Sequence, residues 1–184
     1  MRLAVFLFAL LVPAAAAAPA AKPPQKPPID TLFEQLHQAS SPEEAAPLEE
    51  QIEAIFLRSS SPSVDLLMTR AATALSAGDK TVARKLYDAV TDIAPNYAEG
   101  WHRRGLMQSE AGEDGQAMLS LQKAVQLNPR HFEALEQLGE MLEDYGDKAE
   151  ALKMYRRALA LDPQYEGLQR HIDGLSRTVE GQGI

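Results

Sequence analysis

Apolar and small residues in the last third of the chain fall on two helical faces, which are separated by a glycine and closed by a proline. Four positions spaced i, i+3, i+4 and i+7 predict a first helix: Leu135, Leu138, Gly139 and Leu142. A similar helical spacing predicts a second helix: Ala151, Tyr155, Ala158 and Leu161. Gly146 can adopt the left-handed conformation that ends the first helix, and Pro163 ends the second because it has no backbone N–H to donate. The pattern therefore predicts a helix–turn–helix unit.

This unit is repeated with a period of 34 residues, in the ranges 64–97, 98–131 and 132–165. The prolines that close it are Pro95, Pro129 and Pro163, and the glycines at its turn are Gly78, Gly112 and Gly146. A fixed period of this length is typical of helical arrays in which each unit packs on its neighbours. Small residues where the paired helices cross, such as Gly105 and Gly139, are expected to let the two helices approach closely.

The repeated segments resemble the tetratricopeptide repeat, whose pattern places Trp, Leu, Gly and Tyr, then Ala, Phe, Ala and Pro at set positions. The matching segments are WHRRGLMQ, LEQLGEML, AMLSLQKAVQLNP and AEALKMYRRALALDP. Arg70 and Arg104 stand where the family prefers Leu, and we expect their aliphatic stems to cover apolar surface while their charges stay in water. The resemblance implies an all-α solenoid with a concave groove.

Both flanks of the repeats are predicted to be helical. Residues 29–63 read as a degenerate helical hairpin, which we expect to pack on the first repeat or else to cover the apolar end of the groove. Residues 166–180 place Leu168, Ile172, Leu175 and Val179 on one stripe and predict a capping helix, the terminal element that a repeat stack requires.

The N-terminal segment has the order of a secretory signal peptide. Residues 1–20 contain Arg2, an apolar run from Leu3 to Val12 and an alanine-rich tail, and residues 21–28 form a proline-rich linker. We therefore expect the protein to be exported, with the periplasm as its compartment. The alternative is an uncleaved segment that anchors the chain to a membrane, although Pro13 and Pro19 interrupt the apolar run.

Composition excludes several classes of function. A formal net charge of -8 disfavours nucleic-acid binding, which needs a concentrated basic patch. The chain has no cysteine, so thiol nucleophiles and cysteine-based zinc sites are excluded. His37, His102, His131 and His171 form no known metal-binding or catalytic motif. We therefore predict no enzymatic activity, no cofactor and no metal.

The resemblance also implies which residues line the groove, because the family uses set places of the first helix in each repeat. The candidate peptide-binding residues are Met68, Ala72, Leu75, His102, Arg103, Leu106, Glu133, Glu136, Gln137, Glu140, Glu143 and Asp144. Some co-chaperones of the family grip a carboxyl terminus with Lys, Asn and Arg at five of these places. Here those places hold Met68, Ala72, Arg103, Glu133 and Gln137, so binding of that kind is not expected.

Carboxylates dominate the third-repeat part of this groove. The pairs Glu136/Glu140 and Glu140/Asp144 are four residues apart, and like charges at that spacing cost a helix about 0.2–0.5 kcal/mol each. Two interpretations stay open. The acidic face is either merely solvated and partly neutralised by bases such as Arg103, or it docks a cationic or amphipathic segment with apolar help from Met68, Leu75 and Leu106.

These observations predict a non-enzymatic adaptor or scaffold of the bacterial cell envelope that binds a protein or peptide segment in its groove. We expect it to be a monomer. The alternatives are a structural homo-oligomer, in which the concave face packs on a second copy, and an assembly factor for cytochrome c or envelope complexes, which the resemblance to exported tetratricopeptide proteins suggests.

Overall fold

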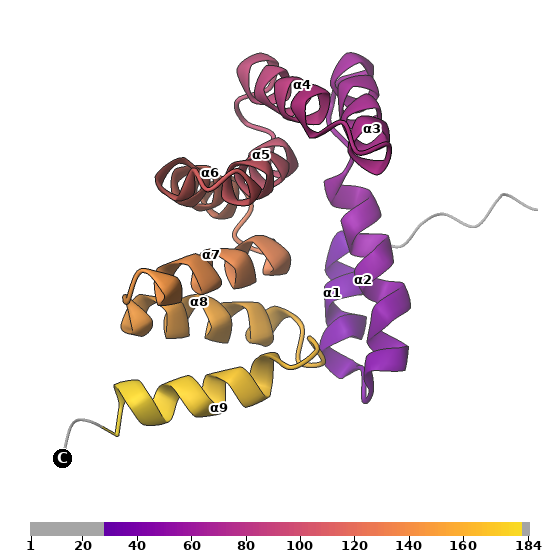
Figure 1. Cartoon of the computed structure of the whole chain (residues 1–184). Coiled ribbons are helices and arrows are strands. Elements are labelled where there is room, and N and C mark those ends of the chain that lie inside the picture. The colour runs from indigo at the N-terminus through magenta and orange to yellow at the C-terminus, as the bar shows by residue number, and fades with distance from the viewer. Residues whose placement is uncertain (1–27, 182–184) are drawn as a thin grey trace, which may run out of the picture.

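The computed structural model describes residues 28–181, and within them the chain forms an all-helical stack (Figure 1). A hairpin is followed by three helix pairs and a last helix. The bounds are α1 (Ile29–Gln38), α2 (Pro42–Phe56), α3 (Pro62–Ser76), α4 (Lys80–Ile93), α5 (Ala98–Glu110), α6 (Asp114–Leu127), α7 (Phe132–Asp144), α8 (Lys148–Leu161) and α9 (Leu168–Val179). The predicted all-α repeat solenoid with an N-terminal hairpin and a C-terminal capping helix is confirmed. The predicted signal peptide and residues 21–27 lie outside the described residues.

The turns inside the helix pairs have the predicted backbone conformation. Gly78, Gly112 and Gly146 have φ angles of 80°, 73° and 85°, in the left-handed region that glycine enters without strain. The following helices then start at an acidic residue, and the Asp79 and Asp147 side chains accept hydrogen bonds from the backbone N–H groups of Val82 and Glu150. Each helix pair is therefore a tight antiparallel hairpin.

Small residues set the distance between the paired helices. Ala83, Ala117 and Ala151 are fully buried where the second helix of each pair faces the first. A Cβ atom added to Gly139 would lie 2.6 Å from the Tyr155 ring, well inside the usual contact distance of about 3.5–4.0 Å. The close approach of α7 and α8 thus depends on the absence of a side chain at Gly139.

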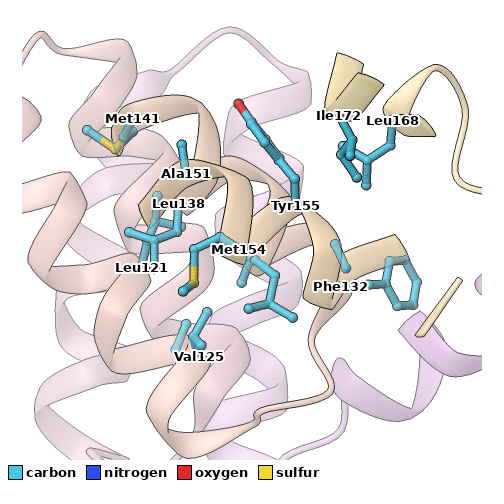
Figure 2. Close-up of a cluster of buried hydrophobic side chains, with 14 of the residues drawn as sticks. Leu121, Val125, Phe132, Leu138, Met141, Ala151, Met154, Tyr155, Leu168 and Ile172 are labelled. Carbon is cyan, nitrogen blue, oxygen red and sulfur yellow. The ribbon is translucent and has the colours of Figure 1, made fainter. Parts of the chain in front are cut away.

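The buried residues form two separate apolar clusters. The larger one joins the α1–α2 hairpin to α6, α7, α8 and α9, and Figure 2 shows part of it, where Leu121 lies beside Leu138. The smaller cluster belongs to α3 and α4, with Met107 contributed by α5. The capping helix α9 completes the larger cluster with Leu168, Ile172 and Leu175.

The sequence led us to expect that the hairpin packs on the first repeat, but its main packing partners lie elsewhere. Its buried residues Leu32, Leu36 and Ile52 belong to the core of the second and third repeats. Figure 1 shows the hairpin running along the edge of the stack where α7 begins, α8 ends and α9 begins. The expectation was wrong because the segment after Phe56 leads the chain away to α3, so sequence neighbours are not the main packing partners.

None of the helices among residues 28–181 combines the length and the apolar character that crossing a bilayer requires.

Candidate functional site

The candidate groove residues lie on the inner helices α3, α5 and α7, as their places in the repeats imply, but the structure distributes most of them over three distinct sites. The first is an acidic pocket beside α7 and α9. The second is a buried polar network between α5 and α7. The third is an apolar pocket on α3.

The acidic pocket encloses about 460 Å³ between the inner face of α7 and the start of α9. Its walls combine carboxylates with aromatic and aliphatic groups: Glu136, Glu140, Glu143, Asp144, Tyr155, Tyr165, Glu166, Gly167, Leu168 and His171. The pocket thus brings together the four predicted carboxylates of α7 that follow Glu133. It also adds Glu166 from the turn before the capping helix, which the groove prediction did not include.

Carboxyl groups in the acidic pocket crowd one another. Burial, followed by the charge of Glu140, raises the pKa of Glu136 to about 8. At neutral pH Glu136 therefore keeps its proton for most of the time and shares it with Glu140. Glu143 is already engaged, since its Oε2 accepts a hydrogen bond from the Tyr155 hydroxyl at 3.2 Å and lies 2.6 Å from His171 Nε2. A cation in this pocket would displace the shared proton.

A buried carboxylate organises the polar network. Glu99, at the start of α5, is only 2% exposed, and its Oε1 accepts a hydrogen bond from Arg103 Nε. Its Oε2 lies 2.7 Å from His131 Nε2 and 3.4 Å from His102 Nδ1. The other ring nitrogen of His102 lies 2.8 Å from Gln137 Oε1 on α7. The contact of His102 with Gln137 therefore ties the second repeat to the third.

Electrostatics explain why Glu99 can stay ionised in this position. Burial alone would raise the pKa of Glu99, but the hydrogen bonds from His102 and His131 and the charge of Arg103 lower the pKa below its ordinary value. Burial lowers the pKa of His131, which favours a neutral imidazole. His102, Arg103 and Gln137 are consequently committed to the network, and fully buried His102 offers no surface to a partner in this arrangement.

Glu99, His102 and His131 also carry the donor atoms of a metal site, which lie within 4.8 Å of one another. The protonation of His131 argues against that use. The backbone N–H of Ala134 points at His131 Nδ1 at 3.4 Å, so the proton of the neutral ring belongs on Nε2, where it is donated to Glu99. A metal would need the lone pair of that same Nε2. We therefore assign these three residues to the hydrogen-bonded network that joins the second and third repeats.

The apolar pocket lies where the hairpin leads into the first repeat and encloses about 550 Å³. Its lining includes Met68 and Ala72 from the candidate groove, together with Leu57, Arg58, Asp65, Thr69, Thr73 and Ser76. Leu75 packs on the core of the first repeat, and Leu106 is half-buried on α5. The first-repeat end of the groove is therefore apolar and the third-repeat end acidic.

Sequence reasoning missed the polar network because it judged each histidine alone. His131 is the last residue of the second repeat and Glu99 is the second residue of the same repeat, so 32 positions separate them. Successive repeats stack in register. The last residue of a repeat therefore lies at the start of the next inner helix, beside the first turn of the inner helix of its own repeat. Reading His131 as a neighbour of Glu99 through this stacking would have found the pair.

Family models for the tetratricopeptide repeat match residues 98–131 and 132–165. The chain contains tetratricopeptide repeats at these two places. A TPR repeat-containing protein of Rhizobium etli is 30% identical over 107 residues, which are 58% of this chain and 52% of that protein. The chain thus spans about half the length of the curated relative that it matches.

Two solved structures that contain bound peptides share the fold. The first TPR of Spaghetti (RPAP3), bound to an HSP90 peptide, has a TM-score of 0.58 at 20% identity, over 64% of this chain and 93% of that one. The Yersinia enterocolitica type III secretion chaperone SycD, in complex with a peptide of the translocator YopD, has a TM-score of 0.58 at 17% identity, over 68% of this chain and 98% of that one. At these identities the likeness concerns the fold alone.

Proposed function

We propose that this tetratricopeptide repeat protein is a non-enzymatic adaptor whose acidic pocket binds a basic segment of another protein. The observation that carries the proposal is the gathering of Glu136, Glu140 and Glu143 beside Tyr155 and Leu168 in one pocket. Related folds with bound peptides support the use of such a stack as a peptide receptor. Carboxylates next to aromatic and aliphatic walls suit the ammonium or guanidinium group and the apolar stem of Lys or Arg.

The chemistry of the pocket makes a cation the best occupant. Burial and the charge of Glu140 raise the pKa of Glu136 to about 8, and a positive charge between Glu136 and Glu140 would oppose both effects by stabilising the ionised carboxylates. The bound state would therefore release the shared proton. An anionic or purely apolar segment would gain nothing from these carboxylates.

The HSP90 peptide seen on the Spaghetti domain is a poor guide to the ligand of this protein. The places at which some family members bind a carboxyl terminus hold Met68, Ala72, Arg103, Glu133 and Gln137 here. Arg103 is bound to Glu99, and Glu133 is an acid, which offers a terminal carboxylate no positive partner. We infer a basic internal segment rather than an acidic carboxyl terminus.

A binding experiment with a defined peptide tests this proposal. The probe is a fluorescent peptide with alternating Lys and Leu, and the comparison peptide replaces every Lys with Glu. Fluorescence anisotropy of the folded protein should show binding of the Lys peptide that weakens as salt is raised, since screening reduces charge pairing. The variant with Glu136, Glu140 and Glu143 all changed to Gln should lose at least tenfold in affinity.

A matched control separates the pocket from the overall negative charge. Changing Glu34 and Glu50 to Gln and Asp92 to Asn removes the same formal charge from exposed positions outside the pocket. This control should bind the Lys peptide almost as well as the unchanged protein. The proposal fails if the two triple variants lose equal affinity, because binding would then follow net charge alone.

Proton release supplies a second signature of the same site. Because the pKa of Glu136 is about 8 in the empty pocket, the affinity for the Lys peptide should rise between pH 6.5 and 8.5 and then level off. Changing Glu136 alone to Gln should flatten this rise.

The cell envelope is the setting that we propose for this adaptor, in the periplasm, on the basis of the signal-peptide pattern in residues 1–20. Fractionation of the native cell would test it: a mature chain shortened by about 20 residues should appear with the periplasmic proteins. Recovery of full-length protein with the membranes would instead support an anchored N-terminus.

A further inference from the structure

The α1–α2 hairpin covers the edge of the second and third repeats through apolar packing and a few polar contacts. Its apolar face supplies Leu32, Leu36 and Ile52 to the larger core, and the Phe56 ring lies 4.8 Å from the ring of His131. One peripheral ion pair joins Asp30 to Arg130 at 2.7 Å. One polar bond runs from Gln164 Nε2 to the carbonyl oxygen of Ala39 at 3.0 Å. Arg130 also lies over the Phe33 ring at 4.6 Å, and residues 57–61 link the hairpin to the first repeat along the chain.

The same interface sets acid against acid at two places. Glu49 of α2 stands near Asp162, in the turn between α8 and α9, and this nearness raises the pKa of Glu49. Glu53, one helical turn further along α2, stands near Glu133 at the start of α7 and raises the pKa of Glu133. Complementary surfaces normally avoid such pairs, because two ionised carboxylates in contact repel each other strongly.

The surroundings of the Asp162 carboxyl show most clearly that the Glu49–Asp162 pair needs a shared proton. The side chain of Asp162 is fully buried, and its Oδ1 accepts a hydrogen bond from the backbone N–H of Gln164 at 3.0 Å. Its Oδ2 is buried and has no donor among the described residues. A buried acceptor without a donor is costly, and a protonated Glu49 is the neighbour that can supply one.

Every element packed around these pairs contributes to the balance of charge. Burial comes first in raising the pKa of Glu49 to about 7, and the charges of Asp162, Glu53 and Glu133 follow. Burial and Glu53 likewise raise the pKa of Glu133 to about 7, although His102 and Arg103 on α5 oppose the shift. The ion pair of Asp30 with Arg130 is complementary and so favours docking while both groups are ionised.

We propose that the hairpin is a displaceable cover, which its apolar face docks on the second and third repeats and which loosens when the carboxyl pairs at this interface lose the protons that they share. Released carboxyls would have the ordinary pKa of 4.5, so the docked state binds extra protons between about pH 4.5 and 7 and docking weakens as pH rises through that range. For Glu49 alone, the docking equilibrium falls roughly thirtyfold between pH 5.5 and 8.5.

The consequence for binding rests on the proposed function. Phe56 and Glu53 lie over His131 and Glu133, directly before the α7 turns that carry the acidic pocket. Displacing the hairpin would therefore extend the acidic inner face by Glu133 and Asp162. A basic segment that is longer than the pocket would gain both carboxylates, and it would compete with the hairpin for them.

Distance measurements on the full protein without any peptide test the cover itself. The chain has no cysteine, so Glu34→Cys on α1 and Arg157→Cys on α8, both exposed positions on neighbouring helices, give one defined pair of spin labels. A single short distance is expected at pH 5.5, with a longer population growing at pH 8.5. Hydrogen exchange of the α1 and α2 amides, corrected for the intrinsic effect of pH, should lose protection by tens of fold over the same range.

Two variants make the outcome decisive. Changing Glu49 and Glu133 to Gln keeps a donor at each pair and removes the charge, so the hairpin should stay docked at both pH values. Changing Glu43 and Glu50, which are exposed on the same helix, to Gln should leave the pH response intact. The proposal is overturned if the protein with intact carboxyl pairs shows the same label distance and the same protection at both pH values. It is also overturned if the Glu49/Glu133 variant responds to pH as strongly as that protein does. The peptide assay is a separate measurement, so failure of peptide binding leaves this result standing.

Discussion

Gly139 offers the sharpest test of how closely α7 and α8 pack, because the same substitution can be made for comparison at Gly174, where a Cβ meets no other atom. Gly139→Ala adds a Cβ in the middle of α7, where it would lie 2.6, 2.7 and 3.1 Å from three ring atoms of Tyr155. Gly174→Ala adds a Cβ in the middle of α9, where no atom lies within 4 Å. Both glycines are interior to a helix, so the change in helix propensity is the same.

The magnitudes predict opposite signs for the two substitutions. Replacing an interior glycine by alanine favours a helix by about 0.8–1.0 kcal/mol, and this is the whole effect expected at Gly174. At Gly139 the Tyr155 ring is buried and cannot simply swing outwards, and overpacking of this kind costs about 1–3 kcal/mol. Gly139→Ala should therefore lower the free energy of unfolding by up to about 2 kcal/mol after the propensity gain is subtracted.

Urea unfolding followed by circular dichroism measures both values under the same conditions. The Gly139 variant should unfold at a lower urea concentration than the parent protein and the Gly174 variant at a higher one. The Tyr155 hydroxyl should also lose its 3.2 Å bond to Glu143 if the ring is pushed aside. Equal stabilisation by both alanines would refute the reasoning, because it would mean that α7 and α8 do not need a glycine where they cross.

Two further predictions concern charged groups. Glu99→Gln should destabilise the protein by about 2–4 kcal/mol at pH 7, since it leaves the buried contacts of His131 and Arg103 without their charge. Because the pKa of Glu99 is lowered in the folded state, the contribution of Glu99 to the free energy of unfolding is complete above about pH 4.5 and is lost as pH falls. The free energies of unfolding of the variant and the parent should therefore converge in acid. Asp30→Asn, by contrast, removes an ion pair whose acidic side chain is 77% exposed, and thermal unfolding should detect a change of less than about 1 kcal/mol. A loss above that value would mean that the hairpin depends on this pair.

The repeat architecture could be predicted from the sequence because its signals are local and periodic. Gly112 and Gly146 have positive φ angles, and Leu138 and Ala151 lie in the core, because each position is dictated by its own helix pair. Three copies in phase make such signals reinforce one another. The capping stripe of Leu168, Ile172 and Leu175 was predictable for the same reason, since an amphipathic helix at the end of a stack has one surface on which to pack.

The candidate site was only partly predictable, because burial depends on what lies across from each position. The same groove place holds His102 in the second repeat and Glu136 in the third, yet His102 is closed inside the polar network while Glu136 faces a pocket. The difference comes from Phe56, Gln137 and His131, which surround the second-repeat end. A family pattern identifies the inner face, but it does not say which part of that face is open.

Charge complementarity does not explain where the hairpin packs. Complementarity would direct Glu49 and Glu53 toward basic residues, but α2 brings them to Asp162 and Glu133. The apolar residues decide the docking, since fully burying a side chain such as Leu32 or Ile52 is worth about 1.5–3 kcal/mol. Several such side chains outweigh a repulsion that a shared proton can remove. The acidic pairs therefore do not repel each other at low pH, where they share protons, and they repel each other only after those protons are lost. A count of charges along the sequence cannot predict this pH response of the hairpin.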